Sequence, residues 1–236
     1  MNDIELGEIL YRLAVEAHPK DDPELELLLK ARAIGKLYHF TSIDNLESIF
    51  HYGFLGRSVL EERNLEFTVS DYSRNEPIRD GICFSISRPN EYMMLQKISN
   101  GRKLVLLELE NPIEIMKSSV FIALPGNFGS HKVKENFQQW PEKFVGGKGL
   151  VNLFLNETLR MKFSLMSQEP TDPRSEIVFL TPVNQKYIKR IISPPDFEYA
   201  SQEKVRLLIS KLPVGIEFVS QSRELFQPLN LSLIHI

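Results

Sequence analysis

Short apolar runs and stretches in which apolar and polar residues alternate recur along the chain and predict β-strands. The clearest is the run at residues 103–109, which follows the turn signal Asn100-Gly101 and ends at Asn111-Pro112. Strands are predicted at residues 37–41, 82–87, 103–109, 119–124, 177–180, 187–192 and 216–220.

Apolar residues at helical spacing predict helices between these strands. Near the N-terminus, Asp22 and Pro23 are typical of a helix start and Gly35 of its end. Residues 57–80 are charged and only weakly periodic, which favours a functional or mobile loop. Helices are predicted at residues 4–17, 22–34, 43–50, 92–98, 150–160 and 201–212.

Short strands separated by loops, with helices gathered towards the N-terminal half, predict an α+β domain built on mostly antiparallel sheets. We expect a helical packing unit at residues 1–35 and the main domain at residues 36–230, which together form one globular domain. Residues 231–236 match what a transposon sequencing adapter would encode, so His235 receives no functional role.

Composition narrows the classes of function. The 236 residues, 42% of them hydrophobic, suffice for one domain with a core. A net charge of −3 gives no overall field that attracts nucleic acid, so any such site must be a local groove. The single cysteine, Cys83, excludes internal disulfides and thiolate metal sites. An acidic N-terminus and the absence of a long apolar run predict a cytoplasmic protein without a membrane span.

A carboxylate stands where a stiff loop enters the core. Pro170 and Pro173 restrict the backbone of residues 169–175, and Glu176 begins the apolar strand that follows. Enzymes place acids at such positions, although a glutamate that merely begins a strand is the alternative interpretation. His39 lies near the end of an earlier strand beside polar residues, where it either binds a polar ligand or is a structural histidine.

Three stretches together resemble the DarT family, whose members are toxins that transfer ADP-ribose from NAD to bases of single-stranded DNA. They are residues 37–46 (LYHFTSIDNL), 84–93 (FSISRPNEYM) and 170–178 (PTDPRSEIV), and the resemblance extends over roughly residues 36–193. It implies the ADP-ribosyltransferase fold, a split pair of antiparallel sheets with NAD in the cleft between them. The third stretch is closer to the guanine-modifying branch than to the thymine-modifying one.

The resemblance also implies roles for individual residues. Glu176 would be the catalytic carboxylate, His39 and Thr41 would hold NAD at its adenosine-side ribose and nicotinamide amide, and Asn45 would contact NAD from the start of the following helix.

Further roles fall on residues of the loops. An arginine before residue 82 would meet the pyrophosphate or the reacting centre, with Arg79 assigned to catalysis and Arg74 to cofactor binding. Arg174, Tyr92 and Asn90 would contact the substrate strand.

The chemistry favours a carboxylate independently of the resemblance. Breaking the bond between nicotinamide and ribose builds positive charge on the ribose, which a fixed anion stabilises. The same group can accept the proton of the attacking base, and a positioned base contributes about 10² to 10⁴ in rate. No metal is required.

The leading hypothesis is therefore an NAD-dependent DNA ADP-ribosyltransferase, the toxin of a toxin–antitoxin or phage-defence system. Its implied partner is an antitoxin hydrolase that removes ADP-ribose, with a macrodomain or related fold. One alternative is an enzyme of the same fold that modifies RNA or protein. Another is a catalytically inactive domain that binds NAD or nucleic acid.

Overall fold

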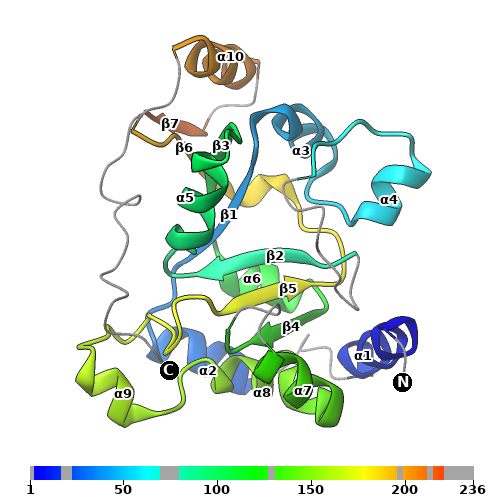
Figure 1. Cartoon of the computed structure of the whole chain (residues 1–236), viewed down its shortest axis with the longest axis vertical. Coiled ribbons are helices and arrows are strands. Elements are labelled where there is room, and N and C mark those ends of the chain that lie inside the picture. The colour runs from blue at the N-terminus through cyan, green and yellow to red at the C-terminus, as the bar shows by residue number, and fades with distance from the viewer. Residues whose placement is uncertain are drawn as a thin grey trace.

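The computed structural model describes residues 3–16, 23–69, 80–126, 131–195, 199–211 and 215–220. Its strands are β1 (Lys36–Ser42), β2 (Ile82–Ile86), β3 (Leu104–Glu110), β4 (Phe121–Leu124), β5 (Glu176–Phe179), β6 (Ile188–Ile192) and β7 (Glu217–Val219) (Figure 1). Its helices are α1 (Asp3–Glu16), α2 (Pro23–Ala31), α3 (Leu46–Tyr52), α4 (Arg57–Glu62), α5 (Glu91–Ser99), α6 (Pro112–Lys117), α7 (His131–Gln139), α8 (Gly146–Asn152), α9 (Glu157–Lys162) and α10 (Tyr199–Ser210), with 3₁₀ helices η1 (Ile43–Asn45), η2 (Pro141–Phe144) and η3 (Gln185–Tyr187).

The strands form a sheet with the order β4-β5-β2-β1-β3-β6-β7, in which neighbours are antiparallel except for the parallel pair β6 and β7. β1 pairs with β3 along its whole length but with β2 at Leu37↔Ile86 and Tyr38↔Ser85. This short junction divides the sheet into the groups β4-β5-β2 and β1-β3-β6-β7, and Figure 1 shows β1 running steeply across the direction of β2 and β5. The predicted α+β architecture on mostly antiparallel strands is confirmed.

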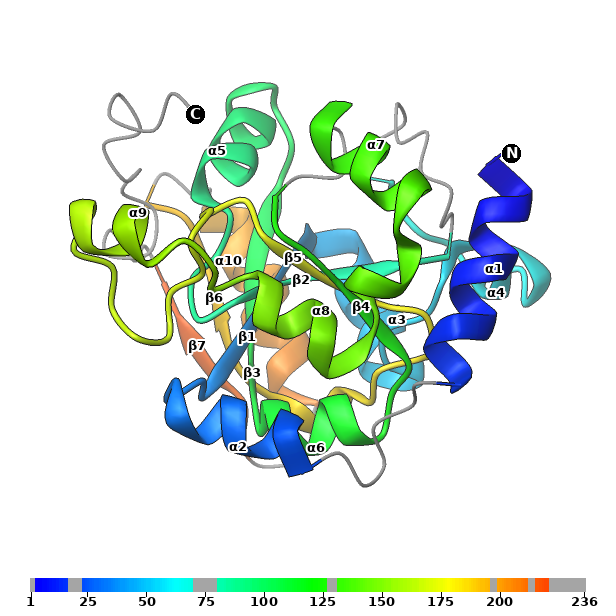
Figure 2. The ribbon, with the colours of Figure 1, turned by 90° about the horizontal axis from the view of Figure 1, so that it is seen from below.

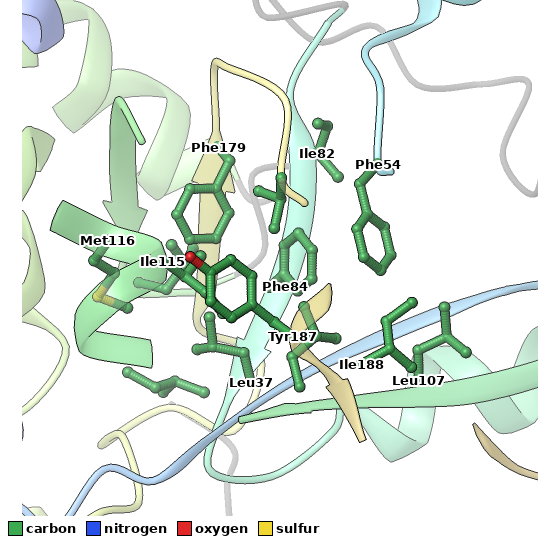
Figure 3. Close-up of a cluster of buried hydrophobic side chains, with 14 of the residues drawn as sticks. Leu37, Phe54, Ile82, Phe84, Leu107, Ile115, Met116, Phe179, Tyr187 and Ile188 are labelled. Carbon is green, nitrogen blue, oxygen red and sulfur yellow. The ribbon is translucent and has the colours of Figure 1, made fainter. Parts of the chain in front are cut away.

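The core lies between these strands and the helices that cover them. Figure 3 shows Phe84 of β2 between Phe54 and Phe179, and its ring centroid lies 5.1 Å and 5.2 Å from theirs. Leu25 and Leu29 of α2 belong to the same buried cluster. Burial of each such side chain contributes about 1.5–3 kcal/mol, so the aromatic row anchors β2 to β5.

Two of the predictions for segments outside the strands differ from the structure. The predicted helix at residues 150–160 is wrong, because Asn156 adopts a left-handed conformation (φ 72°) and starts a separate helix, α9. The prediction that residues 57–80 form an irregular loop is wrong for the first residues, because Arg57–Glu62 forms α4. The Asp80 carboxylate accepts a hydrogen bond from the Ser58 N–H at 2.7 Å and so caps the first turn of α4 from outside the helix.

The predicted strands are all present, each within one or two residues of the expected bounds. Helices α2 and α6 lie next to each other along one side of the molecule (Figure 2), and Lys117 of α6 forms an ion pair with Glu26 of α2. Within the described ranges, no helix combines the length and the apolar character that crossing a membrane requires.

Candidate active site

A cavity of about 210 Å³ lies where the two strand groups meet, and most of the predicted site residues line it. His39 and Thr41 come from β1, Asn45 from the end of η1, Asn90 from the start of α5, and Glu176 from the start of β5. Because these residues are far apart in the sequence, the fold brings them together. The rest of the wall comes from residues 38, 40, 48, 49, 53–57, 60, 67–69, 81–85, 93 and 97.

The sheet fixes the position of Glu176. β5 is antiparallel to β2 with Phe84 opposite Ile177, so the next pair of positions along the two strands is Ser85 and Glu176. Both residues line the cavity, and Glu176 is only 8% exposed. A carboxylate held by paired strands at the edge of a cavity suits the stabilisation of positive charge on a ligand.

The loop before Glu176 is held by hydrogen bonds as well as by its prolines. The buried guanidinium of Arg160 donates to the carbonyl oxygens of Glu169 at 2.6 Å and Met166 at 2.8 Å. Thr171 donates its N–H to the carbonyl of Leu153 at 2.8 Å. The stiff loop predicted from the sequence therefore has a physical basis in α9 and the turn before it.

This loop is also connected to α5. The guanidinium of Arg88 donates to the Glu91 carboxylate at 3.0 Å and 3.2 Å, and to the Glu169 carboxylate at 3.4 Å. Glu169 in turn accepts the Met166 N–H at 2.9 Å. Arg88 thereby links the loop to the first turn of the helix that carries Asn90.

The hydrogen bonding of His39 determines its tautomer. Its Nδ1 lies 2.8 Å from the carbonyl oxygen of Cys83 on β2. Because a carbonyl only accepts, Nδ1 carries the proton, and in the neutral ring Nε2 is then the acceptor. The ring also packs against Phe54 and Phe84, each at 5.2 Å between centroids. His39 thus has a structural contact on one ring nitrogen while it lines the cavity.

Asn45 holds a segment of the wall. Its Nδ2 donates to the Thr41 hydroxyl and to the Thr68 carbonyl, both at 3.0 Å, and its Oδ1 accepts the Thr68 N–H at 2.7 Å. The amide is engaged within the protein, and residues 67–69 of the wall are fastened to η1 by it. Its predicted contact with NAD stays a prediction.

A charge network is centred on the buried Glu108 and reaches the cavity wall at Tyr38. The Tyr38 hydroxyl donates to Glu108 at 3.0 Å, and Arg190 and Lys36 also bind this carboxylate at 2.6 Å and 3.1 Å. Burial alone would raise the pKa of Glu108, but the hydrogen bonds from Arg190, Lys36 and Tyr38 outweigh it and lower this pKa. Burial, followed by the nearby Glu108 charge, raises the pKa of Tyr38. Tyr38 is therefore a fixed, neutral part of the wall.

Two cationic residues of the wall were not predicted as site residues. Arg57 begins α4, and Lys97 lies one helical turn after Met93 on the face of α5 that also carries Asn90. Because Asn90 was predicted as a site residue, the helical spacing from Asn90 through Met93 to Lys97 could have identified Lys97 on the same face of the predicted helix. Arg57 gave no such signal, because its position depends on how Asp80 caps α4. The two cations make the wall suitable for an anionic ligand.

Arg174 and Tyr92, which the structure describes, do not line this cavity. Arg174 is exposed and bound to Asp172 at 2.7 Å, and this hydrogen bond raises the pKa of Arg174. Tyr92 points outwards from α5 and is 57% exposed. Arg74 and Arg79 lie outside the described residues. The substrate and cofactor roles of these residues stay predictions.

Comparison with solved structures shows that the fold is similar to that of a known protein. The structure of Thermosipho africanus DarTG in complex with ADP-ribose aligns with 81% of this chain at a TM-score of 0.50 and 16% sequence identity. The chain shares the fold of this DarTG structure. It spans about half the length of that protein, since the alignment covers 50% of the DarTG chain.

Two further solved structures align with lower TM-scores. Thermus sp. 2.9 DarT in complex with NAD⁺ has a TM-score of 0.48 and 13% identity, with 81% of this chain and 97% of the DarT chain covered. The same protein in complex with ADP-ribosylated single-stranded DNA has a TM-score of 0.45 and 14% identity, with 82% and 96% covered. No protein-family model and no curated protein matches the sequence.

Proposed function

We propose that the chain is an NAD-dependent ADP-ribosyltransferase that modifies a base of single-stranded DNA. The observation that carries this proposal is the meeting of His39, Thr41 and Glu176 in one cavity, although they come from separate sequence stretches that resemble DarT. The fold shared with DarTG, whose structure contains ADP-ribose, supports it.

NAD is the co-substrate in this proposal, and the residues of the wall divide its binding between them. His39 and Thr41 hold the adenosine-side ribose and the nicotinamide end. Arg57 and Lys97 lie in the described wall of the same cavity as Glu176. Because both side chains are positively charged, they suit the anionic pyrophosphate. Arg79 and Arg74 keep the roles that the resemblance implies for them.

Glu176 performs two tasks in the transfer. As the bond between the ribose C1′ and the nicotinamide nitrogen breaks, its carboxylate stabilises the positive charge that develops on the ribose. A nitrogen of the base then bonds to C1′, and Glu176 accepts the proton that this nitrogen loses. Nicotinamide leaves as a neutral molecule, so the step needs no further reactant.

The experiment is mass spectrometry of short single-stranded DNA oligomers after incubation with the protein and NAD. Each oligomer offers one base type, and guanine is the expected acceptor. An ADP-ribose adduct on one base, present with the wild type and lost with Glu176→Gln, supports the proposal. Glu203→Gln is the control, since Glu203 is an exposed residue of α10.

Other results separate the alternatives. NAD consumption without a DNA adduct contradicts the DNA substrate, and RNA and protein acceptors are then tested in the same assay. Intact NAD in every reaction contradicts the enzyme and leaves the inactive binding domain. Both outcomes are read from the same samples by quantifying nicotinamide.

We also propose a toxin role in the cytoplasm, with an antitoxin that removes ADP-ribose through a macrodomain or related fold. The support is the resemblance to DarT alone. Induced expression in bacteria should arrest growth for the wild type and not for Glu176→Gln. Co-expression of a macrodomain hydrolase that removes ADP-ribose from DNA should restore growth. Growth arrest that persists in Glu176→Gln would contradict a role for the transferase reaction in toxicity.

A further inference from the structure

The side-chain amide of Asn90 is a buried hydrogen-bond donor in the cavity wall. Asn90 is 4% exposed and lines the cavity, yet its Nδ2 has no hydrogen-bond partner among the described residues. A buried amide donor without a partner costs about 1–3 kcal/mol, so its presence in the wall of a cavity points to a ligand that satisfies it.

Other contacts fix the direction in which this donor points. The Oδ1 of Asn90 caps α5 by accepting the Met93 N–H at 3.2 Å, and its backbone N–H donates to the Ser85 hydroxyl at 3.1 Å. Because Oδ1 is bound to the first turn of α5, the amide cannot exchange its oxygen and nitrogen without losing the cap.

The register of the sheet places the donor at the Glu176 end of the cavity. Ser85, which accepts the Asn90 N–H, is the β2 position that follows Phe84, and Phe84 is paired with Ile177 of β5. Asn90 is therefore attached to the strand position beside Glu176. Arg57 and Lys97 supply the wall with charged donors for phosphate, whereas Asn90 supplies a neutral, oriented one.

We infer that Asn90 determines ligand specificity by donating a hydrogen bond from Nδ2 to a carbonyl oxygen at the reacting end of the cavity. This inference rests on the proposed function. Two groups present such an oxygen beside the reacting C1′: the carboxamide of nicotinamide, and the ring carbonyl of the acceptor base. A neutral amide donor fits either oxygen. Because it carries no positive charge, it does not repel the positive charge that develops on the ribose.

The test uses variants that keep the cap and remove the amide donor, because the side chain of Asp has no N–H and the Ser hydroxyl is on a shorter side chain. Asp and Ser cap helices about as well as Asn, so Asn90→Asp and Asn90→Ser both keep the cap, and Asn90→Ser, which adds no charge to this buried position, should melt close to the wild type. Neither presents an amide N–H. We expect both to lose about 10- to 100-fold in transfer to single-stranded DNA, as expected for loss of a hydrogen bond from a buried site. Asn184→Asp, at the exposed cap of η3, is the matched control.

Two arms distinguish the source of the carbonyl. Calorimetric titration with NAD is performed in a Glu176→Gln background, with and without Asn90→Asp, so that NAD is not consumed. Weaker NAD binding in the double variant assigns the contact to the nicotinamide carboxamide. Equal NAD binding, together with impaired DNA transfer by Asn90→Asp, assigns it to the base.

The inference fails if Asn90→Asp and Asn90→Ser both transfer ADP-ribose to DNA at the wild-type rate, because the cap is then the only role of Asn90. That result leaves the proposed function intact. An inactive wild type overturns the proposed function and this inference together, so the two failures are distinguishable.

Discussion

The side chain of Asn45 binds both backbone groups of Thr68, accepting its N–H at 2.7 Å and donating to its carbonyl at 3.0 Å. In a β-sheet, a neighbouring strand binds the backbone N–H and carbonyl of a residue in the same way. Here one amide takes its place and connects the segment 67–69, which is part of the cavity wall, to the end of β1. Asn45 therefore shapes the cavity wall through this segment, and its predicted contact with NAD stays a prediction.

Removing this amide should loosen the wall. In Asn45→Ala, the Thr68 N–H loses its acceptor, and we expect its hydrogen exchange to become at least about ten-fold faster, equivalent to roughly 1.4 kcal/mol. NAD binding should weaken while the melting temperature changes little. Exchange measured by mass spectrometry with peptide resolution checks this, with Asn184→Ala as the control. Unchanged exchange at Thr68 would show that the segment is held by other contacts.

Arg160 should be a positioning residue for the loop before Glu176. It is 3% exposed, and in Arg160→Met its two short bonds to the carbonyls of Met166 and Glu169 are lost. We expect a loss of roughly 2–3 kcal/mol in the free energy of unfolding, because hydrogen bonds from a charged donor to buried carbonyls are removed. Urea unfolding measures it, with the exposed Arg206→Met as the control.

The same variant also tests how far the loop governs Glu176. At a temperature where Arg160→Met is still folded, transfer to DNA should fall more than NAD binding does, because the loop precedes the carboxylate and the cavity wall is otherwise intact. A variant that is as stable and as active as the wild type would contradict the positioning role of Arg160.

Sequence patterns identified elements and motifs, but not the contacts between distant segments. The strand that starts at Glu176 and the strand that carries His39 follow from apolar runs, because each is a local feature of the chain. The break before Asn156 depends on a left-handed backbone conformation that a periodic pattern does not reveal. The place of Arg57 in the cavity wall depends on Asp80, which is distant in sequence and caps α4. Long-range contacts of this kind complete the candidate site.

Stability should depend on acid pH through Glu26. Hydrogen bonds from Lys117 and then Lys30 lower the pKa of Glu26 to about 2. Since the unfolded chain has an ordinary pKa of about 4.3, the contribution of the ionised Glu26 is complete above that pH and is lost as pH falls towards 2. Glu26→Gln should therefore melt below the wild type at pH 7, and this difference should disappear towards pH 2.

The matched control for Glu26 is Glu62→Gln, at an exposed position of α4. Melting temperatures of the three proteins are measured by circular dichroism between pH 7 and pH 2, at low salt because exposed ion pairs are screened by salt. A difference between Glu26→Gln and the wild type that stays constant over this range would contradict the contribution of the carboxylate charge.

Gly149 of α8 should tolerate no side chain, because the backbone of η2 lies too close to it. A Cβ at this position would lie 2.1 Å from the carbonyl oxygen of Phe144, a backbone atom that cannot move aside. Gly149→Ala should thus destabilise the protein by about 1–3 kcal/mol, although alanine favours helices by about 1 kcal/mol. In Gly35→Ala the new Cβ meets nothing within 4 Å, and the change should stay within about 0.5 kcal/mol. The free energy of unfolding of both variants and of the wild type is measured in urea. A Gly149→Ala variant as stable as the wild type would contradict the clash and would show that η2 and α8 can move apart.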